Sequence, residues 1–208
     1  MTKVNVKFNG KVASLIGKKY AEVATVAIDR SGKSYETVHN LKLGKGFAPA
    51  IGTYLAIAGT LESLEGLNWI EATSCVELKG APEDLNMYAW VEGEAASSFF
   101  EPKSLTDEFS SKRPFGVASV KLNETQRQRG IVFNALISKM RENLKAGAIV
   151  RLAGRLQYRT YTNAEGKDMT VAEIICNNEW TKILKPSTRK NPFSFEVEPD
   201  MSGFGIKE

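Results

Sequence analysis

Histidine and cysteine are scarce in this chain of 208 residues, which contains one histidine, His39, and two cysteines, Cys75 and Cys176. Two cysteines without metal-ligand spacing are too few for a disulfide framework, so we expect both to be small buried apolar residues. A single histidine gives no supporting motif for a histidine-based metal site or a Ser-His-Asp arrangement. We therefore expect no metal and no cofactor.

Long hydrophobic runs are also missing, although 42% of the residues are hydrophobic and 25% are charged. No run approaches the roughly 18 apolar residues that a membrane-spanning helix needs. The first ten residues, MTKVNVKFNG, lack the apolar core of a secretory signal. These absences predict a cytoplasmic protein with a hydrophobic core.

Enzyme motifs are absent too: there is no phosphate-cradling glycine loop, no paired-carboxylate motif and no nucleophile elbow. We therefore expect a binding protein and not an enzyme. The net charge of +4 permits a phosphate-bearing partner but does not demonstrate one, because many cytosolic enzymes have a similar balance.

What the sequence does contain is an internal repeat. GTYLAIAGTLES at 52–63 resembles GAIVRLAGRLQY at 147–158, with an offset of 95 residues. EVATVAI at 22–28 resembles GVASVKL at 116–122, and NGKVAS at 9–14 resembles EGEAAS at 92–97. The same blocks occur in the same order, which indicates a duplication.

Each copy has the alternation of a β-sheet protein, as Val4, Val6 and Phe8 show in the first copy. Five strands per copy predict a small barrel. In the second copy, Leu136, Met140 and Leu144 are spaced four apart and Gly147 follows, which predicts a helix between strands three and four. The expected strands are 3–15, 22–29, 35–43, 53–63 and 69–78, then 87–98, 115–122, 130–137, 148–162 and 168–176.

This pattern is that of an all-β protein with two tandem OB folds, the second carrying a helix between its third and fourth strands. Gly80, Ala81 and Pro82 interrupt the pattern between the copies. We expect a first domain at 1–80, a second at 84–184 and a flexible tail at 185–208.

The second copy resembles a known family over about 90 residues. Its segment LKAGAIVRLAGRLQYRTYTNAEGKDMTVAEI is similar to the fourth-strand region of the bacterial single-stranded-DNA-binding proteins. Gly154, Leu156, Arg159 and Glu173 fall on the family's pattern, and Tyr161 replaces its stacking tryptophan. The resemblance reaches the first copy only through the repeat.

The resemblance also shows departures. The family places aromatic residues on the third strand where Ile131 and Ile137 align, so Phe133 is the ring that remains for stacking. The chain ends DMSGFGIKE, without the family's acidic tail. By resemblance, two barrels per chain imply a homodimer that presents four OB folds, with replication or recombination proteins as further partners.

Binding of single strands needs cations for phosphates and rings for unstacked bases. On the fourth strand Arg155, Gln157, Arg159 and Tyr161 share one face, while Leu156, Tyr158 and Thr160 share the other. The candidate DNA contacts of the second copy are Arg155, Arg159, Tyr161, Lys112, Arg113, Phe133 and Arg127. Those of the first copy are Lys11, Lys18, Tyr35 and His39.

Each residue has an alternative role. The arginines are also typical of solvated strand or loop positions, Tyr158 fits packing better than ligand contact, and His39 fits a half-buried polar position. Arg127 and Arg129 are interpreted as part of a tight polar turn.

The leading hypothesis is that the protein binds and protects single-stranded DNA, with little sequence preference, during replication, recombination or repair. A host, phage or plasmid setting is left open. The alternative is an OB-fold assembly module that has lost DNA binding. An RNA-binding role has no reader of the 2′-hydroxyl to support it.

Overall fold

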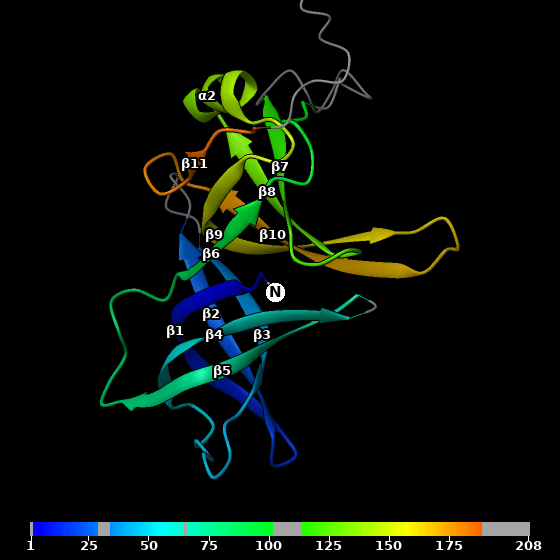
Figure 1. The fold of residues 1–208 in the computed structure, drawn as a ribbon. Helices are drawn as coiled ribbons and strands as arrows, with labels where there is room; N and C mark the ends of the chain where they lie inside the picture. The colour runs from blue at the N-terminus through cyan, green and yellow to red at the C-terminus, as the bar shows by residue number, and fades with distance from the viewer. Residues whose placement is uncertain (1, 29–33, 65, 102–113, 189–208) are drawn as a thin grey trace, which may run out of the picture.

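The computed structural model describes residues 2–28, 34–64, 66–101 and 114–188. Within these ranges, eleven strands and one helix follow one another in two halves, stacked in Figure 1. The first half contains β1 (Val4–Ile16), β2 (Tyr20–Ile28), β3 (Ser34–Lys42), β4 (Tyr54–Leu64) and β5 (Leu67–Leu78). The second contains β6 (Met87–Glu94), β7 (Phe115–Lys121), β8 (Arg127–Phe133), α2 (Ala135–Asn143), β9 (Ile149–Thr162), β10 (Asp168–Cys176) and β11 (Lys182–Lys185).

Strand pairing closes each half into a ring. In the first half β1 pairs with β2, β2 with β3, β3 with β5, β5 with β4, and β4 with β1. In the second half β6 pairs with β9, β9 with β10, β10 with β8, and β8 with β7, and an Ala95–Val120 bridge closes the ring. The predicted fold class, two tandem OB folds, is confirmed.

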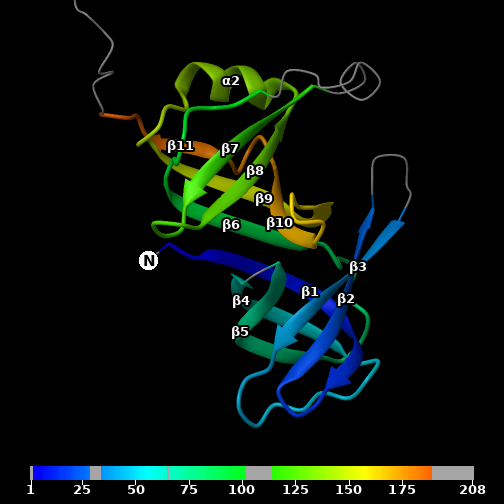
Figure 2. The same cartoon turned by 90° about the vertical axis from the view of Figure 1, so that its right-hand side faces the viewer.

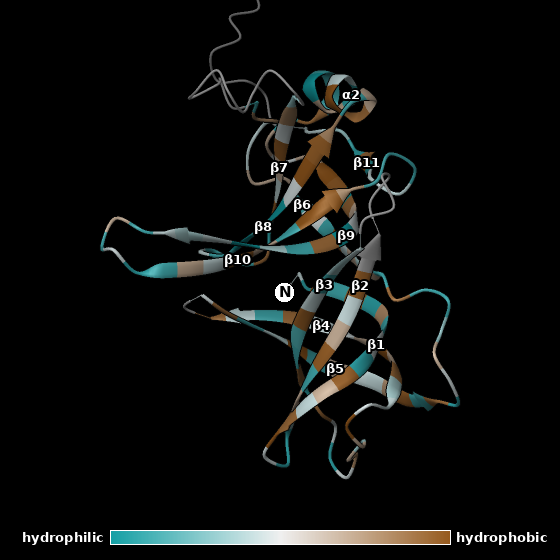
Figure 3. Ribbon diagram, turned by 180° about the vertical axis from the view of Figure 1, so that it is seen from behind, coloured by the Kyte–Doolittle hydropathy of each residue, from teal (hydrophilic) through white to brown (hydrophobic). Residues whose placement is uncertain are grey.

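The strands form because apolar residues alternate toward the inside of each ring. Val4, Val6 and Phe8 of β1 are buried, whereas Lys7 between them is exposed. Figure 3 shows hydrophobic stretches alternating with hydrophilic ones along the strands of both halves.

The predicted helix is α2, and it covers one end of the second ring (Figure 2). Leu136, Ile137 and Met140 of α2 are buried, and the Leu144 amide donates to the Met140 carbonyl over 2.9 Å. The expected third strand at 130–137 was displaced: β8 is Arg127–Phe133, and Ile137 belongs to the helix. Arg127 and Arg129 therefore lie on a strand and not in a turn.

Steric limits explain why the two copies share glycines at equivalent positions. A Cβ at Gly59 would lie 2.4 Å from the carbonyl oxygen of Glu71, and one at Gly154 would lie 1.9 Å from that of Ile175. Gly52 and Gly147 both have left-handed backbones, with φ of 88° and 86°. The two copies therefore need glycine at the same places for the same reasons.

One block of the repeat was aligned in the wrong register. The sequence alignment of the two copies makes Val23 the equivalent of Val117. Val23 is fully buried, however, whereas Val117 lies on the outer face. The ring-closing pairs are Val12–Val23 and Ala95–Val120, so the structural equivalent of Val23 is Val120. A shift of three residues reverses the face of a strand, which is why the match was misleading.

The two halves join through their first strands, which pair antiparallel and run side by side in Figure 2. Asn5 pairs with Trp90, Val6 with Ala89, and Lys7 with Tyr88. Since β1 and β6 are equivalent strands, this ladder relates the halves by a local twofold axis.

A buried polar contact reinforces the junction. The His39 ring lies 2.8 Å from Thr25 Oγ1 through Nε2 and 3.1 Å from the Tyr158 hydroxyl through Nδ1. The rings of Phe8 and Tyr158 each lie 5.4 Å from the ring of His39. His39 of the first half thereby contacts β9 of the second.

Cys176 is buried and Cys75 is half-buried, and both are free thiols. Burial raises the pKa of Cys176 to about 12 and that of Cys75 to about 11. Within the described ranges, no helix is long and apolar enough to cross a membrane.

The buried His39 predicts a loss of stability in mild acid. Burial lowers the pKa of His39 from 6.5 to about 4, so the folded chain rejects a proton that the unfolded chain accepts below pH 6.5. This contribution is complete above pH 6.5 and falls as the pH drops toward 4. From pH 7.5 to pH 5 it should lower the free energy of unfolding by about 2 kcal/mol.

Urea denaturation at both pH values, on the native chain and on His39→Gln, measures that contribution. The variant should lose about 2 kcal/mol less than the native chain between the two pH values, whatever its stability at pH 7.5. Equal losses in both proteins would contradict the assignment.

Candidate functional site

A groove of about 590 Å³ crosses the outer face of the second half. Four strands and the segment before β7 form its surface, which is mostly apolar with a few charged groups. Its lining residues are Ser97, Phe100, Phe115, Val117, Ser119, Arg129, Ile131, Phe133, Gln157, Arg159 and Glu173.

Three phenylalanine rings lie in this groove. Phe115 of β7 and Phe133 of β8 stand directly opposite each other in the ladder, with ring centroids 6.3 Å apart. Phe100 is 59% exposed, and its backbone pairs with Val117 of β7. Exposed rings of this kind offer flat apolar surfaces to a planar ligand.

Arg159 supplies a cation at a fixed position. Its guanidinium lies 3.1 Å, through Nη2, from Oε1 of Glu173 and 5.6 Å from the ring of Tyr161. The Glu173 side chain is only 4% exposed, whereas that of Arg159 is 49% exposed. One edge of the guanidinium therefore neutralises a buried carboxylate and the rest faces solvent.

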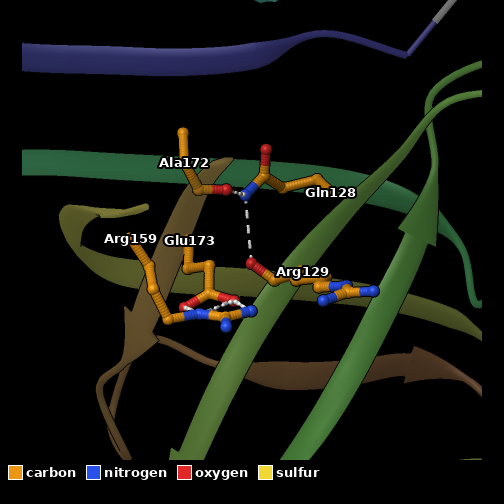
Figure 4. A network of polar contacts seen from close by, with 5 residues as sticks. All are labelled: Gln128, Arg129, Arg159, Ala172 and Glu173. Atoms are coloured by element: carbon orange, nitrogen blue, oxygen red, sulfur yellow. Dashed lines mark hydrogen bonds and ion pairs between the residues drawn. The ribbon is translucent and has the colours of Figure 1, made fainter. Parts of the chain in front are cut away.

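Gln128 connects β8, which carries Arg129, to β10, which carries Glu173 (Figure 4). Its buried side-chain amide donates to the carbonyl of Ala172 over 2.9 Å and to that of Arg129 over 3.0 Å. The bond to Ala172 ties β8 to β10, and the ladder between these two strands has only three residue pairs. The neighbouring Arg129 is exposed and forms no ion pair within the described residues.

The predicted faces of β9 are confirmed up to Arg159. Gln157 and Arg159 line the groove, whereas Leu156 is buried and Tyr158 packs against the core and His39. Burial also raises the pKa of the Tyr158 hydroxyl. Tyr161 is exposed on the arm formed by β9 and β10.

A second hollow of about 310 Å³ adjoins the groove, since Gln157 lines both. Arg155 of β9 and Tyr35 of β3 line this hollow from opposite halves of the chain. The structure thus brings together one predicted contact from each copy.

Several other predicted residues lie apart from the groove. Lys11 of β1 lies 5.9 Å from the ring of Tyr54, Lys18 lies in the turn after β1, and Arg127 lines a hollow between the halves. Lys112 and Arg113 fall outside the described residues.

The expectation that His39 contacts DNA was wrong. It is 1% exposed, so its ring cannot reach a base. Both ring nitrogens are instead occupied by the hydroxyls of Thr25 and Tyr158.

Phe100, Phe115 and Arg129 were missing from the predicted contacts. Arg129 was overlooked because the third strand was displaced, and Phe115 because the register of β7 was shifted. The alternation Arg129, Ile131, Phe133 was the available signal, because it places a cation and a ring on one face of a strand.

The ion pair of Arg159 with Glu173 predicts that removing the arginine lowers stability as long as the buried carboxylate remains. Arg159→Ala would leave the buried Glu173 carboxylate without its partner and should lower the free energy of unfolding by about 1–3 kcal/mol. Glu173→Gln in the same chain should recover most of that loss, because it removes the buried charge.

Urea denaturation followed by circular dichroism measures both effects. Arg155→Ala is the matched control, since it removes the same charge from the same strand and should change stability by less than about 0.5 kcal/mol. An Arg159→Ala chain as stable as this control would show that the ion pair is not structural.

Comparison with known proteins adds a family match in the region of the groove. Residues 111–180 match the model of the single-strand binding protein family. No curated protein matches the sequence.

Two solved structures are similar over nearly the whole chain. The wild-type single-stranded DNA binding protein from Thermus aquaticus has a TM-score of 0.63 at 15% identity, over 92% of this chain and 95% of that one. A deletion variant of the same protein has a TM-score of 0.60 at 14% identity, over 93% and 98%. At such low identity the likeness establishes the fold. The match over residues 111–180 is to the single-strand binding protein family, and both solved structures are of a single-stranded DNA binding protein.

Proposed function

We propose that this protein binds single-stranded DNA with little sequence preference and protects it during replication, recombination or repair. The observation that carries the proposal is the groove of the second half, where the exposed Phe100 and Phe115 and the half-buried Phe133 stand beside Arg129 and Arg159. The family match and the structural neighbours, which are single-stranded DNA binding proteins, support it.

The groove has the two parts that such binding requires. Unstacked bases stack on Phe100, Phe115 and Phe133, and every base offers a π-face, so the sequence matters little. Arg129 and Arg159 face the phosphates. Arg155 and Tyr35 extend the surface toward the first half, and Tyr161 extends it along the arm.

Binding without catalysis is the whole proposed activity. Among the described residues, no group of three or more His, Cys, Asp and Glu side chains is placed to hold a metal ion. We further propose that 1–80 and 84–184 are the two OB-fold domains and that the protein acts in the cytoplasm, at the nucleoid or, if phage- or plasmid-encoded, in the host cytoplasm. Most of 185–208, the expected flexible tail, lies outside the described residues.

Titration with poly(dT), followed by intrinsic fluorescence at several salt concentrations, tests the function. Quenching should saturate, and affinity should fall as salt rises, with a slope of about −0.7 in log–log form for each phosphate neutralised. Phe115→Ala should weaken binding by about 1–3 kcal/mol, because one base loses its stacking ring. Arg129→Ala should make the salt slope shallower by about 0.7.

Lys139→Ala is the control for charge, because Lys139 is exposed on α2 and does not line the groove. It should leave both the affinity and the slope close to those of the native chain. A native chain that fails to bind poly(dT) at low salt would reject the proposal and favour the assembly module.

We also propose that two chains form a homodimer through the outer face of β6, β9 and β11. Trp180 is 44% exposed there, packs edge-on against Tyr88 at 5.4 Å between centroids, and lines a shallow hollow with Trp90. Exposed tryptophan of this kind is typical of interfaces.

Light scattering after gel filtration should give twice the chain mass of 22.9 kDa. Trp180→Glu should shift the protein to the mass of one chain, because it places a charge in an apolar contact. Phe115→Ala, in the groove, should stay dimeric. A native chain with the mass of one copy would rule out the dimer.

A further inference from the structure

The two halves can be compared position by position because their ladders have equal registers. The fourth and fifth strands pair at Leu61–Ile70 in the first half and at Leu156–Ile174 in the second. The parallel pairs extend the match, since Leu41 stands opposite Ile70 and Gly130 stands opposite Ile174. Every groove position on β7, β8, β9 and β10 therefore has a defined equivalent in the first half.

The strand-borne rings of the groove have no counterpart at these positions. The equivalent of Phe133 is Gly44, and continuing the register from β2 into the preceding turn makes Lys18 the equivalent of Phe115. The first half does carry two rings near this face. Tyr20 is 40% exposed at the position of Val117, and Trp69 is half-buried in the hollow between the halves.

The arginines of the groove are also missing. The equivalent of Arg129 is Asn40, whose side-chain amide donates to the carbonyl of Asn68 over 3.3 Å. The equivalent of Arg159 is Leu64, which is exposed.

Carboxylates stand at this face where the groove has neutral residues. Glu22 and Glu62 take the positions of Ser119 and Gln157. The Nζ of Lys42 lies 2.8 Å from Oε1 of Glu71, so this cation is paired with a carboxylate, as Arg159 is with Glu173 in the groove. Acidic groups at these positions repel phosphates, because like charges at short range raise the free energy of the complex.

We propose, resting on the proposed function, that each chain has one groove for single-stranded DNA, on the second half only. The equivalent face of the first half takes no strand. The first half instead supports the second through the β1–β6 ladder and contributes Tyr35 to the hollow beside the groove.

Calorimetric titration of the native full-length chain with a short deoxythymidine oligonucleotide measures the number of sites directly. About eight nucleotides suit the purpose, since one OB fold covers ~4–16. The expected stoichiometry is one oligonucleotide per chain. Two per chain would overturn the inference while leaving DNA binding intact, whereas no binding at any ratio would overturn the proposed function itself.

Matched substitutions in the two halves give a second measurement. Phe133→Ala should weaken oligonucleotide binding by about 5- to 150-fold, which corresponds to the loss of one stacked base. Tyr20→Ala removes a ring from the equivalent face of the first half and should change affinity by less than twofold. Arg129→Ala removes a cation from the groove of the second half, and Lys42→Ala removes one from the equivalent face of the first half, so this pair makes the same comparison for charge.

Circular dichroism on all four variants separates a lost contact from a lost fold. Folded Tyr20→Ala or Lys42→Ala chains that bind as weakly as Phe133→Ala would overturn the inference. If a second-half variant fails to fold, the stoichiometry of the native chain still decides between one site and two.

Discussion

The antiparallel ladder between β1 and β6 is the contact on which the arrangement of the two halves depends. Because these strands are equivalent, the ladder is self-complementary, with Val6 opposite its own counterpart Ala89. The ladder sets the angle between the two closed rings of strands, and that angle brings β3 of the first half against β9 of the second. The His39–Tyr158 contact and the hollow beside Arg155 both exist because of it. A change in this register would therefore alter the core and the candidate site together.

The two copies have kept their inner positions alike and diverged on their outer positions. Inside, Ile70 and Ile174 pair with Leu61 and Leu156, and Gly59 and Gly154 allow the same close approach of a neighbouring backbone. A packed core tolerates few changes in volume, which limits variation there. Outer positions have no such limit, so rings and arginines could gather on one copy and carboxylates on the other.

Much of the fold could be predicted from the sequence because local patterns encode it. The alternation of β1, the four-residue spacing of α2 and the glycines of the repeat all report local geometry. The displaced β8 had no such pattern, because RGIVFNALI is apolar on both parities and carries helical and strand signals at once. The register of β7 was missed because two registers three residues apart both align valines and alanines. The burial of His39 depends on Tyr158, which lies 119 residues away. Such contacts come from tertiary packing, and no local window contains them.

The buried carboxylate of Glu173 determines how charge and aromatic surface are balanced in the groove. A buried carboxylate beneath the groove would offset part of its attraction for phosphate, and among the described residues two arginines, Arg129 and Arg159, line the groove. The same carboxylate holds the Arg159 guanidinium in place, so less side-chain freedom is lost when a ligand arrives. A fixed but partly neutralised cation orients a backbone more than it attracts one. In the proposed function, most of the binding free energy must then come from stacking on the three phenylalanines. Stacking accepts any base, and this balance of rings over charges therefore favours coating a strand over recognising a sequence.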